Sequence, residues 1–504
     1  MIGTSFSEWV VIRLSIAFFR LTPLLYLLLL ALLLPFAGRT TWVLVGLIVT
    51  STLLLAECAY FVLIWRPYQE RLKQDAVHPT APSREVRKAL FYRCFDNVES
   101  PEIYLRGWFL GAELEEIHLE NIKEFLLWAF FDRHNDLSTD EDSTVVDDVA
   151  EFVEHLEHRI GRRFAPGRGP VKSLRLTFDY IETTYRSLLW YMVIFAVDQL
   201  THLLLLWKGF QYYAAPSQHV FPPRPQQYVS MHRSPVESLS YWYSPHKSKE
   251  KLPLVFFHGI GIGLWVYIEY LSALLNTSSG VEDGIGILAI ELLPISFRLT
   301  RPPPSKVEFL EQMAKILDHH NWEDFVLSSH SYGSVLVTHM LSFPALEKRV
   351  QAVVLIDPVT ILLHLPDVAF NFTRRRPKEA NQWQLWYFAS TDPGVAHCLG
   401  RHFFWRENIL WREDLLGIAS TRQRGTSRKV AVSLSGRDLI TKPGAIAQYL
   451  EASTEESGEI DVIVFPQLDH AQVFDAVAER EQLVNLTRSY CARRWFDRGG
   501  SQSA

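Results

Sequence analysis

Two long apolar runs stand near the start of the chain. Residues 21–37 carry no charge, and residues 42–65 contain Glu57 as their one charged residue. A helix needs about 20 mostly apolar residues to cross the hydrocarbon core of a bilayer. The second run reaches that length, and the first reaches it when Phe18 and Phe19 are included. The pattern predicts a transmembrane hairpin within residues 1–75, with a pair of buried core helices as the alternative.

Basic residues around the hairpin indicate its orientation. Arg13 and Arg20 precede it, three basic residues follow it between positions 66 and 73, and Arg39 alone lies between the two runs. Lys and Arg are enriched on the cytoplasmic side of membrane spans. We therefore expect both ends of the hairpin, and the chain that follows, to lie in the cytosol, at the endoplasmic reticulum or another internal membrane.

Residues 76–225 are predicted to form a helical, membrane-proximal region that ends in a Pro-rich linker. Residues 108–131 place apolar side chains at steps of three and four, as one amphipathic helix does, and the acidic residues 136–148 indicate a solvated loop. Residues 187–207 are long enough to span but contain Asp198, which is costly in lipid. A third span, an interfacial helix and a helix packed on the following domain all stay open, and a third span would move the rest of the chain across the membrane.

Strand and helix patterns alternate within residues 226–504. Apolar strands are predicted at 252–257, 285–290, 325–328, 352–356, 430–434 and 462–465, and helices at 306–319, 334–342 and 445–452. Residues 228–243 could add two antiparallel strands. This alternation is typical of an α/β domain with a mostly parallel sheet covered on both faces. Residues 359–425 interrupt the rhythm and are rich in aromatic residues, so we interpret them as an insertion.

Composition excludes several classes of function. Of 504 residues, 48% are hydrophobic and 21% charged, which rules out a largely disordered protein. The balance of 50 basic against 56 acidic residues gives no electrostatic case for a nucleic-acid partner. Four cysteines lie far apart without a CxxC pair, so they support neither a zinc site nor a disulfide framework.

A pentapeptide between a predicted strand and a predicted helix contains the candidate nucleophile. It reads Ser329-His330-Ser331-Tyr332-Gly333. A serine at such a sharp turn projects its hydroxyl above the sheet edge, and small residues two positions before and after it let the strained turn close. Ser331 is the serine at that position. An ordinary turn that contains serines is the alternative interpretation.

A serine hydroxyl needs a base, and the base needs a third group to orient it. Asp438 and His470 each follow a predicted strand late in the chain. We expect His470 to take the proton of Ser331 and Asp438 to hold the imidazole in the required tautomer. Asp357, at the end of an earlier strand, is the alternative acid.

A glycine-rich loop supplies candidate oxyanion donors. Residues 254–263 read LVFFHGIGIG, a strand followed by His258, Gly259 and further glycines. Backbone amides in such a loop can donate to a developing oxyanion, and the candidates are those of Ile260 and Tyr332. A phosphate-binding loop is the alternative interpretation, but the GK[ST] ending of that motif is missing.

The segment from about residue 228 to 493 resembles the α/β-hydrolase fold family through HGIGIG, SHSYGS, SGRD and LDH, in this order. The resemblance implies a twisted, mostly parallel sheet, the catalytic order Ser…Asp…His and a helical cap after the sixth strand, where residues 359–425 lie. It does not extend to the N-terminal region. The sequence departs from the family pattern G-x-S-x-G at Ser329, where the pattern has glycine.

The combination of this domain with the predicted N-terminal anchor is similar to that of membrane-bound family members that act on esters or lipids. We expect a membrane-anchored serine hydrolase that cleaves carboxylic esters of lipids or other apolar acyl compounds, with the aromatic insertion as lid and pocket. No metal or organic cofactor is expected, and the oligomeric state is not predicted. An acyltransferase with the same triad and a non-catalytic protein that binds lipids or a partner are the alternatives.

Overall fold

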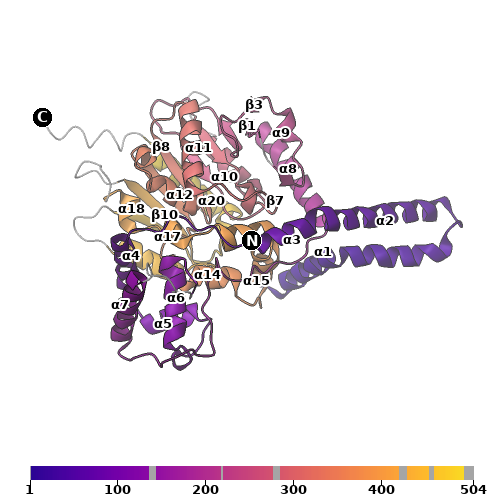
Figure 1. Cartoon of the computed structure of the whole chain (residues 1–504). Helices are drawn as coiled ribbons and strands as arrows, with labels where there is room; N and C mark the ends of the chain where they lie inside the picture. Colours follow the sequence, from indigo (N-terminus) through magenta and orange to yellow (C-terminus); the bar gives the residue numbers. More distant parts are fainter. Residues whose placement is uncertain are drawn as a thin grey trace.

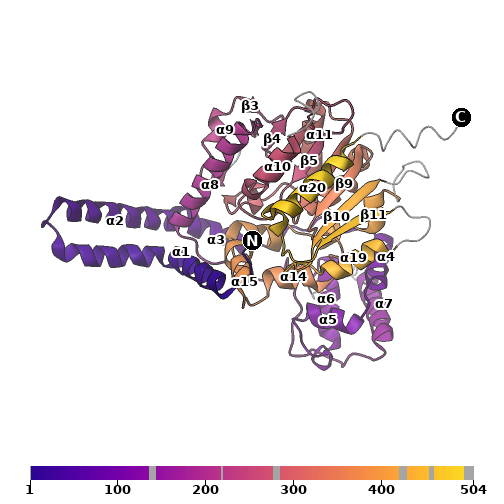
Figure 2. The ribbon, with the colours of Figure 1, turned by 180° about the vertical axis from the view of Figure 1, so that it is seen from behind.

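The computed structural model describes residues 2–134, 143–216, 219–275, 284–418, 428–452 and 459–492. An N-terminal helical hairpin projects from the rest of the molecule, with α1 (Phe6–Leu33) beside α2 (Thr41–Tyr60) (Figures 1 and 2). Leucines along both helices are exposed. A π-helical turn (Phe61–Trp65) continues α2 into α3 (Arg66–Leu72). Both arms of the hairpin are long and apolar enough to cross a membrane.

Four helices follow the hairpin and pack beneath the sheet domain (Figure 1). They are α4 (Arg84–Asp96), α5 (Pro101–Trp108), α6 (Leu119–Phe131) and α7 (Ser143–Ile160). The single helix predicted over residues 108–131 is wrong in its first half, because Leu110 and Gly111 adopt φ angles of 61° and 87° after α5 ends. The loop predicted over residues 136–148 is helical from residue 143, where a buried Asp148 pairs with two arginines of α4. Residues 136–142 lie outside the described residues.

Helix α8 (Leu188–Trp207) is a third helix long and apolar enough to cross a membrane. It runs from the base of the hairpin along the sheet domain (Figures 1 and 2), and it contacts strand β1 and helix α10 of that domain. Its Asp198 forms ion pairs with Arg224 at 3.1 Å and Arg298 at 3.2 Å. In this structure α8 thus packs on the sheet domain, while its length and composition would also allow it to cross a membrane.

A nine-stranded sheet forms the centre of the described part of the chain, in the order β11-β10-β9-β8-β5-β6-β4-β1-β3. The strands are β1 (Gln211–Ala214), β3 (His232–Arg233), β4 (Tyr241–Ser244), β5 (Leu254–Phe257), β6 (Ile287–Ile290), β8 (Phe325–His330), β9 (Val350–Ile356), β10 (Lys429–Ser435) and β11 (Ile460–Phe465). All neighbours from β11 to β6 are parallel, which confirms the mostly parallel sheet. The ends of the six predicted parallel strands differ from the observed ends by at most two residues.

The antiparallel edge of the sheet differs from the prediction. β3 and β4 both lie near the predicted pair of strands, but they do not pair with each other. Instead β1 lies between them, antiparallel to β4 and parallel to β3. β1 comes from a segment predicted as helical, so the sheet begins before the predicted domain boundary at residue 226. A separate pair joins β2 (Val220–Phe221) to β7 (Leu299–Thr300).

Helices cover both faces of the sheet, as predicted for strands that are apolar throughout. Val255 and Phe257 of β5 belong to one buried cluster with residues of α11 (Lys306–His319), α12 (Gly333–Leu341) and α19 (Pro443–Glu451). The intervening residues Leu254 and Phe256 pack on the other face with α10 (Ile268–Leu275) and α20 (Val477–Tyr490). Side chains alternate between the faces of a strand, so each strand contributes to two cores.

The insertion between β9 and β10 is helical. It contains α14 (Pro366–Thr373), α15 (Ala380–Gln384), a π-helical turn (Leu385–Ser390), α16 (Pro393–Arg401), α17 (Trp405–Asn408) and α18 (Arg412–Leu416), and its residues 419–427 lie outside the described residues. Part of its aromatic surface packs on the hairpin: Trp383 and Trp386 join a cluster with Ile12 and Ile16 of α1. The insertion is therefore in contact with the hairpin as well as with the sheet.

Candidate active site

The turn after β8 has the geometry of a nucleophile elbow. Ser331 adopts φ = 51°, between the end of β8 at His330 and the start of α12 at Gly333. A Cβ at Gly333 would lie 2.3 Å from the carbonyl oxygen of Phe257, so this position requires glycine. Ser329, where the family pattern has the other glycine, is fully buried in β8, and its hydroxyl has no hydrogen-bond partner among the described residues. A serine is thus accommodated there.

The structure brings Ser331, His470 and Asp438 into one hydrogen-bonded chain. Nε2 of His470 lies 2.9 Å from Oγ of Ser331, and Nδ1 lies 2.8 Å from Oδ2 of Asp438. Because a carboxylate only accepts, the imidazole must donate from Nδ1, which leaves Nε2 free to accept the serine proton. Asp438 follows β10 and His470 follows β11, so neighbouring strand ends supply the two groups.

Burial and the ion pair between Asp438 and His470 together determine the protonation states of these two residues. Burial lowers the pKa of His470, but the adjacent Asp438 carboxylate, together with the charges of Asp357 and Asp469, outweighs this effect and raises that pKa to about 9. Burial likewise opposes ionisation of Asp438, but His470 and the amides of Ile440 and Thr441 hold its pKa below the usual value. Asp438 therefore stays ionised and favours the imidazolium form of His470.

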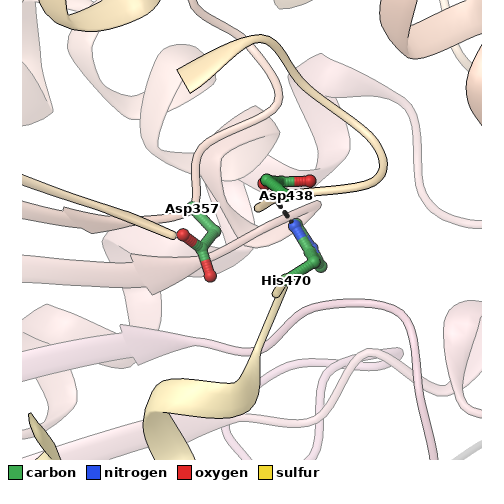
Figure 3. A group of neighbouring side chains, drawn as sticks. All are labelled: Asp357, Asp438 and His470. Carbon is green, nitrogen blue, oxygen red and sulfur yellow. Dashed lines mark hydrogen bonds and ion pairs between the residues drawn. The ribbon is translucent and has the colours of Figure 1, made fainter. Parts of the chain in front are cut away.

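Asp357 lies beside His470, but its carboxylate accepts hydrogen bonds from other residues. Figure 3 shows its carboxyl next to His470, while the dashed hydrogen bond of His470 runs to Asp438. Asp357 accepts from the amide and hydroxyl of Ser435 at 2.7 and 2.9 Å, and from the amide of Ala471 at 3.0 Å. Burial and the charge of Asp438 raise the pKa of Asp357 to about 6. Asp357 thus ties together the two loops that carry Asp438 and His470.

The same residues form the one described group whose ligand atoms could hold a metal ion. Atoms of Asp357, Asp438 and His470 lie within 4.8 Å of one another. However, Nδ1 of His470 is bonded to Asp438, and both oxygens of Asp357 accept hydrogen bonds from protein donors. Hydrogen bonding within the protein thus already accounts for the arrangement of these atoms.

The glycine loop after β5 lies directly against the elbow. A Cβ at Gly259 would be 2.8 Å from Cβ of Ser331, so only glycine permits this approach. The amide of Gly259 donates to the hydroxyl of Tyr267 at 3.0 Å. The amides of Ile260 and Tyr332 have no acceptor within the described ranges. Both candidate oxyanion donors are therefore available beside the serine.

Residues 253–407 match the family model of the alpha/beta hydrolase fold. This match covers the elbow. The acid and histidine loops follow the neighbouring strands β10 and β11, and β9 separates them from the serine strand β8. The chain contains an α/β-hydrolase fold domain. The insertion between β9 and β10 is the helical cap of this domain.

Solved structures similar to the chain include several esterases. The carboxylesterase CesB of Bacillus subtilis is 11% identical, covering 60% of this chain and 97% of its own, with a TM-score of 0.36. The naproxen esterase of Bacillus subtilis is 12% identical, covering 58% and 96%, with a TM-score of 0.36. A bacterial membrane phospholipase A is 12% identical, covering 60% and 92%, with a TM-score of 0.35. These TM-scores are too low to carry an argument about activity. No curated protein matches the chain.

An apolar pocket opens beside Ser331 between the α/β-hydrolase domain and its cap. The space that its walls outline, including the part open to solvent, is about 620 Å³. The sheet domain contributes Ile260, Ser331, Tyr332 and Ile440, and the cap contributes residues such as Phe372 and Trp405. None of the lining residues is charged. An apolar group can therefore be buried next to the serine hydroxyl.

Sequence reasoning missed the residues that the N-terminal helices bring to this pocket. Trp108 of α5, Trp128 of α6 and Leu176 also line it. It also missed Tyr267, whose hydroxyl accepts from the amide of Gly259 in the glycine loop and is hydrogen-bonded to the ring of His330. No short motif marks these positions, because they reach the site only through tertiary packing.

Proposed function

We propose that the protein is a membrane-anchored serine hydrolase that cleaves carboxylic esters of lipids or other apolar acyl compounds. The observation that carries this proposal is the hydrogen-bonded chain from Ser331 through His470 to Asp438 at the wall of an uncharged pocket. A nucleophile, its base and the group that orients the base are the minimum for acyl transfer through serine.

Acylation begins when Oγ of Ser331 attacks the ester carbonyl while Nε2 of His470 takes the hydroxyl proton. The amides of Ile260 and Tyr332 donate to the oxyanion of the tetrahedral intermediate. Collapse of that intermediate breaks the bond to the alkoxy group. The leaving alcohol receives its proton from His470, and Asp438 stabilises the imidazolium in between.

Deacylation repeats these steps with water. His470 takes one proton of a water molecule as its oxygen attacks the acyl-enzyme, and the proton then passes to Oγ of Ser331. The products are the carboxylic acid and free Ser331. An alcohol in place of water would give a new ester, so the ratio of acid to ester formed in the presence of added alcohol distinguishes a hydrolase from an acyltransferase.

Anchoring is the second part of the proposal. The hairpin of α1 and α2 exposes leucines along its length and projects from the domain, as a membrane anchor would. Helix α8 instead carries Asp198 in ion pairs with Arg224 and Arg298 of the domain. Charges paired to a folded domain suit a helix packed on that domain better than one surrounded by lipid. We therefore place the hydrolase domain on the same side as the N-terminus, the cytosolic side by the distribution of basic residues.

Ester hydrolysis by the full-length protein in detergent or vesicles tests the proposed chemistry. Ser331→Ala should lower kcat by at least about 10³-fold, because the nucleophile is lost. Ser329→Ala is the matched control: it removes a buried hydroxyl two residues away that bonds to nothing described, and its activity should stay within a few-fold of the wild-type value. Equal activity of the Ser331→Ala variant and the wild type would overturn the proposal.

A further inference from the structure

The N-terminal helical region forms one wall of the pocket beside Ser331. Trp108 stands at the end of α5, Trp128 within α6, and Leu176 in the segment that follows α7. Both indoles are buried, with 5% and 3% of their surfaces exposed. Their ring centroids lie 5.6 Å apart. A region outside the sheet domain and outside its cap therefore shapes the cavity in which the serine acts.

Hydrogen bonds fix these indoles in place. Nε1 of Trp128 donates to Oγ1 of Thr177 at 3.0 Å, and Nε1 of Trp108 donates to the carbonyl of His364 at 3.2 Å. Trp405 of the cap donates in the same way to the carbonyl of Ala129 in α6, at 3.0 Å. Because the N–H group of each indole already donates a hydrogen bond within the protein, the indoles present only the apolar surface of their rings to the pocket.

Further contacts lock the helical region onto the cap. A Cβ at Gly107 would lie 2.4 Å from Cγ of Pro366, so α5 and α14 meet with no room for a side chain between them. Arg401 of α16 donates to the carbonyls of Gln74 and Thr177. These contacts hold the two indoles in place with respect to the cap helices that also line the pocket.

Because the residues that line the pocket are uncharged and mostly apolar, the pocket favours the apolar part of a substrate. A charged or strongly polar group in this pocket would lose its hydration without gaining a partner, which is unfavourable. A hydrocarbon chain would instead gain free energy with each CH₂ group that it buries. The pocket therefore suits the acyl chain, and the polar part of the alcohol is left outside it.

We propose that Trp108 and Trp128 form the wall that limits the length of the acyl chain, so that the N-terminal helical region determines acyl specificity. This inference rests on the proposed function, since Ser331 marks the carbonyl end of the chain. A rigid wall excludes the methylene groups that exceed the pocket, and a smaller residue in its place admits them.

A series of p-nitrophenyl esters from acetate to palmitate tests this proposal with the full-length protein. Trp128→Ala and Trp108→Ala should raise the ratio of kcat/KM for long chains to that for short chains by about tenfold or more. Ala369→Phe, which fills the same pocket from α14, should shift the ratio in the opposite direction. Trp411→Ala is the matched control, because Trp411 is an equally buried tryptophan outside the pocket lining, and it should leave the ratio unchanged.

The outcomes separate this inference from the proposed function. If the wild type hydrolyses esters through Ser331 but none of the three pocket variants moves the chain-length ratio, the indole wall does not set specificity. A uniform loss across all chain lengths contradicts the inference in the same way. If Trp128→Ala does not fold, as judged by thermal unfolding, Trp128→Leu and Ala369→Phe decide the question. Failure of the wild type to hydrolyse any ester would instead count against the proposed function.

Discussion

At the scale of single residues, three of the eight non-glycine residues with positive φ angles in the described part of the chain lie at the candidate site. Ser331, Asp357 and Ala471 adopt φ angles of 51°, 44° and 66°. A residue other than glycine pays about 1–3 kcal/mol in such a conformation and keeps it only where its surroundings hold it. The amide of Ser331 donates to Ile356 at 3.0 Å, and that of Ala471 donates to Asp357 at 3.0 Å. The strained positions thus support one another across three strand ends.

The pH dependence of activity belongs to His470. The imidazole accepts a proton only when it is neutral, and the Asp438 carboxylate raises its pKa to about 9. The neutral fraction grows as the pH rises through the pKa, so kcat/KM should increase between pH 7 and 9.5. A pH–rate profile of the wild type checks this, and an inflection at or below the ordinary imidazole pKa of about 6.5 would be inconsistent with the ion pair.

Two carboxylates near His470 can be distinguished by isosteric replacement. Asp438→Asn removes the group that holds Nδ1 and should lower kcat by about 10³–10⁴-fold. Asp357→Asn keeps the size of a side chain that bonds Ser435 and Ala471 rather than the imidazole, so kcat should fall by no more than about tenfold. Steady-state kinetics of both variants provide the comparison. A larger loss for Asp357→Asn would make Asp357 the acid.

At the scale of secondary structure, the parallel strands were predictable and the edge strands were not. β8, β9 and β10 are buried along almost their whole length, and each contains an apolar run of three to five residues. β3 is two residues long, too short for a period to be recognised. β1 is as long as β5 and β6 but reads QYYA, without the apolar run that marks those two strands. Helix ends could not be predicted where the backbone conformation, rather than the hydrophobic pattern, ends the helix, as at Gly111 after α5.

The close packing of α5 on the cap helix α14 makes a prediction about stability. Gly107→Ala would place a Cβ 2.4 Å from Cγ of Pro366, and this overpacking should cost about 1–3 kcal/mol of unfolding free energy. Gly444→Ala in α19 is the matched control, because no atom lies within 4 Å of its Cβ position. It should be neutral or stabilising by up to about 1 kcal/mol. Thermal unfolding measures both, and equal effects would refute the contact.

At the scale of the whole molecule, the hydrolase domain, cap, helical region and hairpin form a connected assembly. Arg13 of the hairpin lies 3.8 Å from the ring centre of Trp383 in the cap, and Trp405 of the cap bonds the helical region. The candidate site residues could be predicted because each stands in a local motif at a strand end. The pocket could not, since Trp108 and Trp128 meet the cap only after long-range packing.

The membrane topology follows from how α8 packs. If α8 lies against the domain through Asp198, the hairpin alone crosses the bilayer and both chain ends share one side. In sealed microsomes, tags at both termini should then be digested by added protease, and a C-terminal glycosylation tag should stay unmodified. A glycosylated C-terminal tag together with a digestible N-terminal tag would show a third crossing.

The central claim is that Ser331 is a nucleophile activated by His470 and Asp438. Labelling with a fluorophosphonate probe, followed by mass spectrometry of the adduct, tests it most directly. The account predicts one modified serine, Ser331, in the wild-type protein and no labelling of the Ser331→Ala variant. Labelling that persists in Ser331→Ala, or an adduct that maps to another serine, would contradict it.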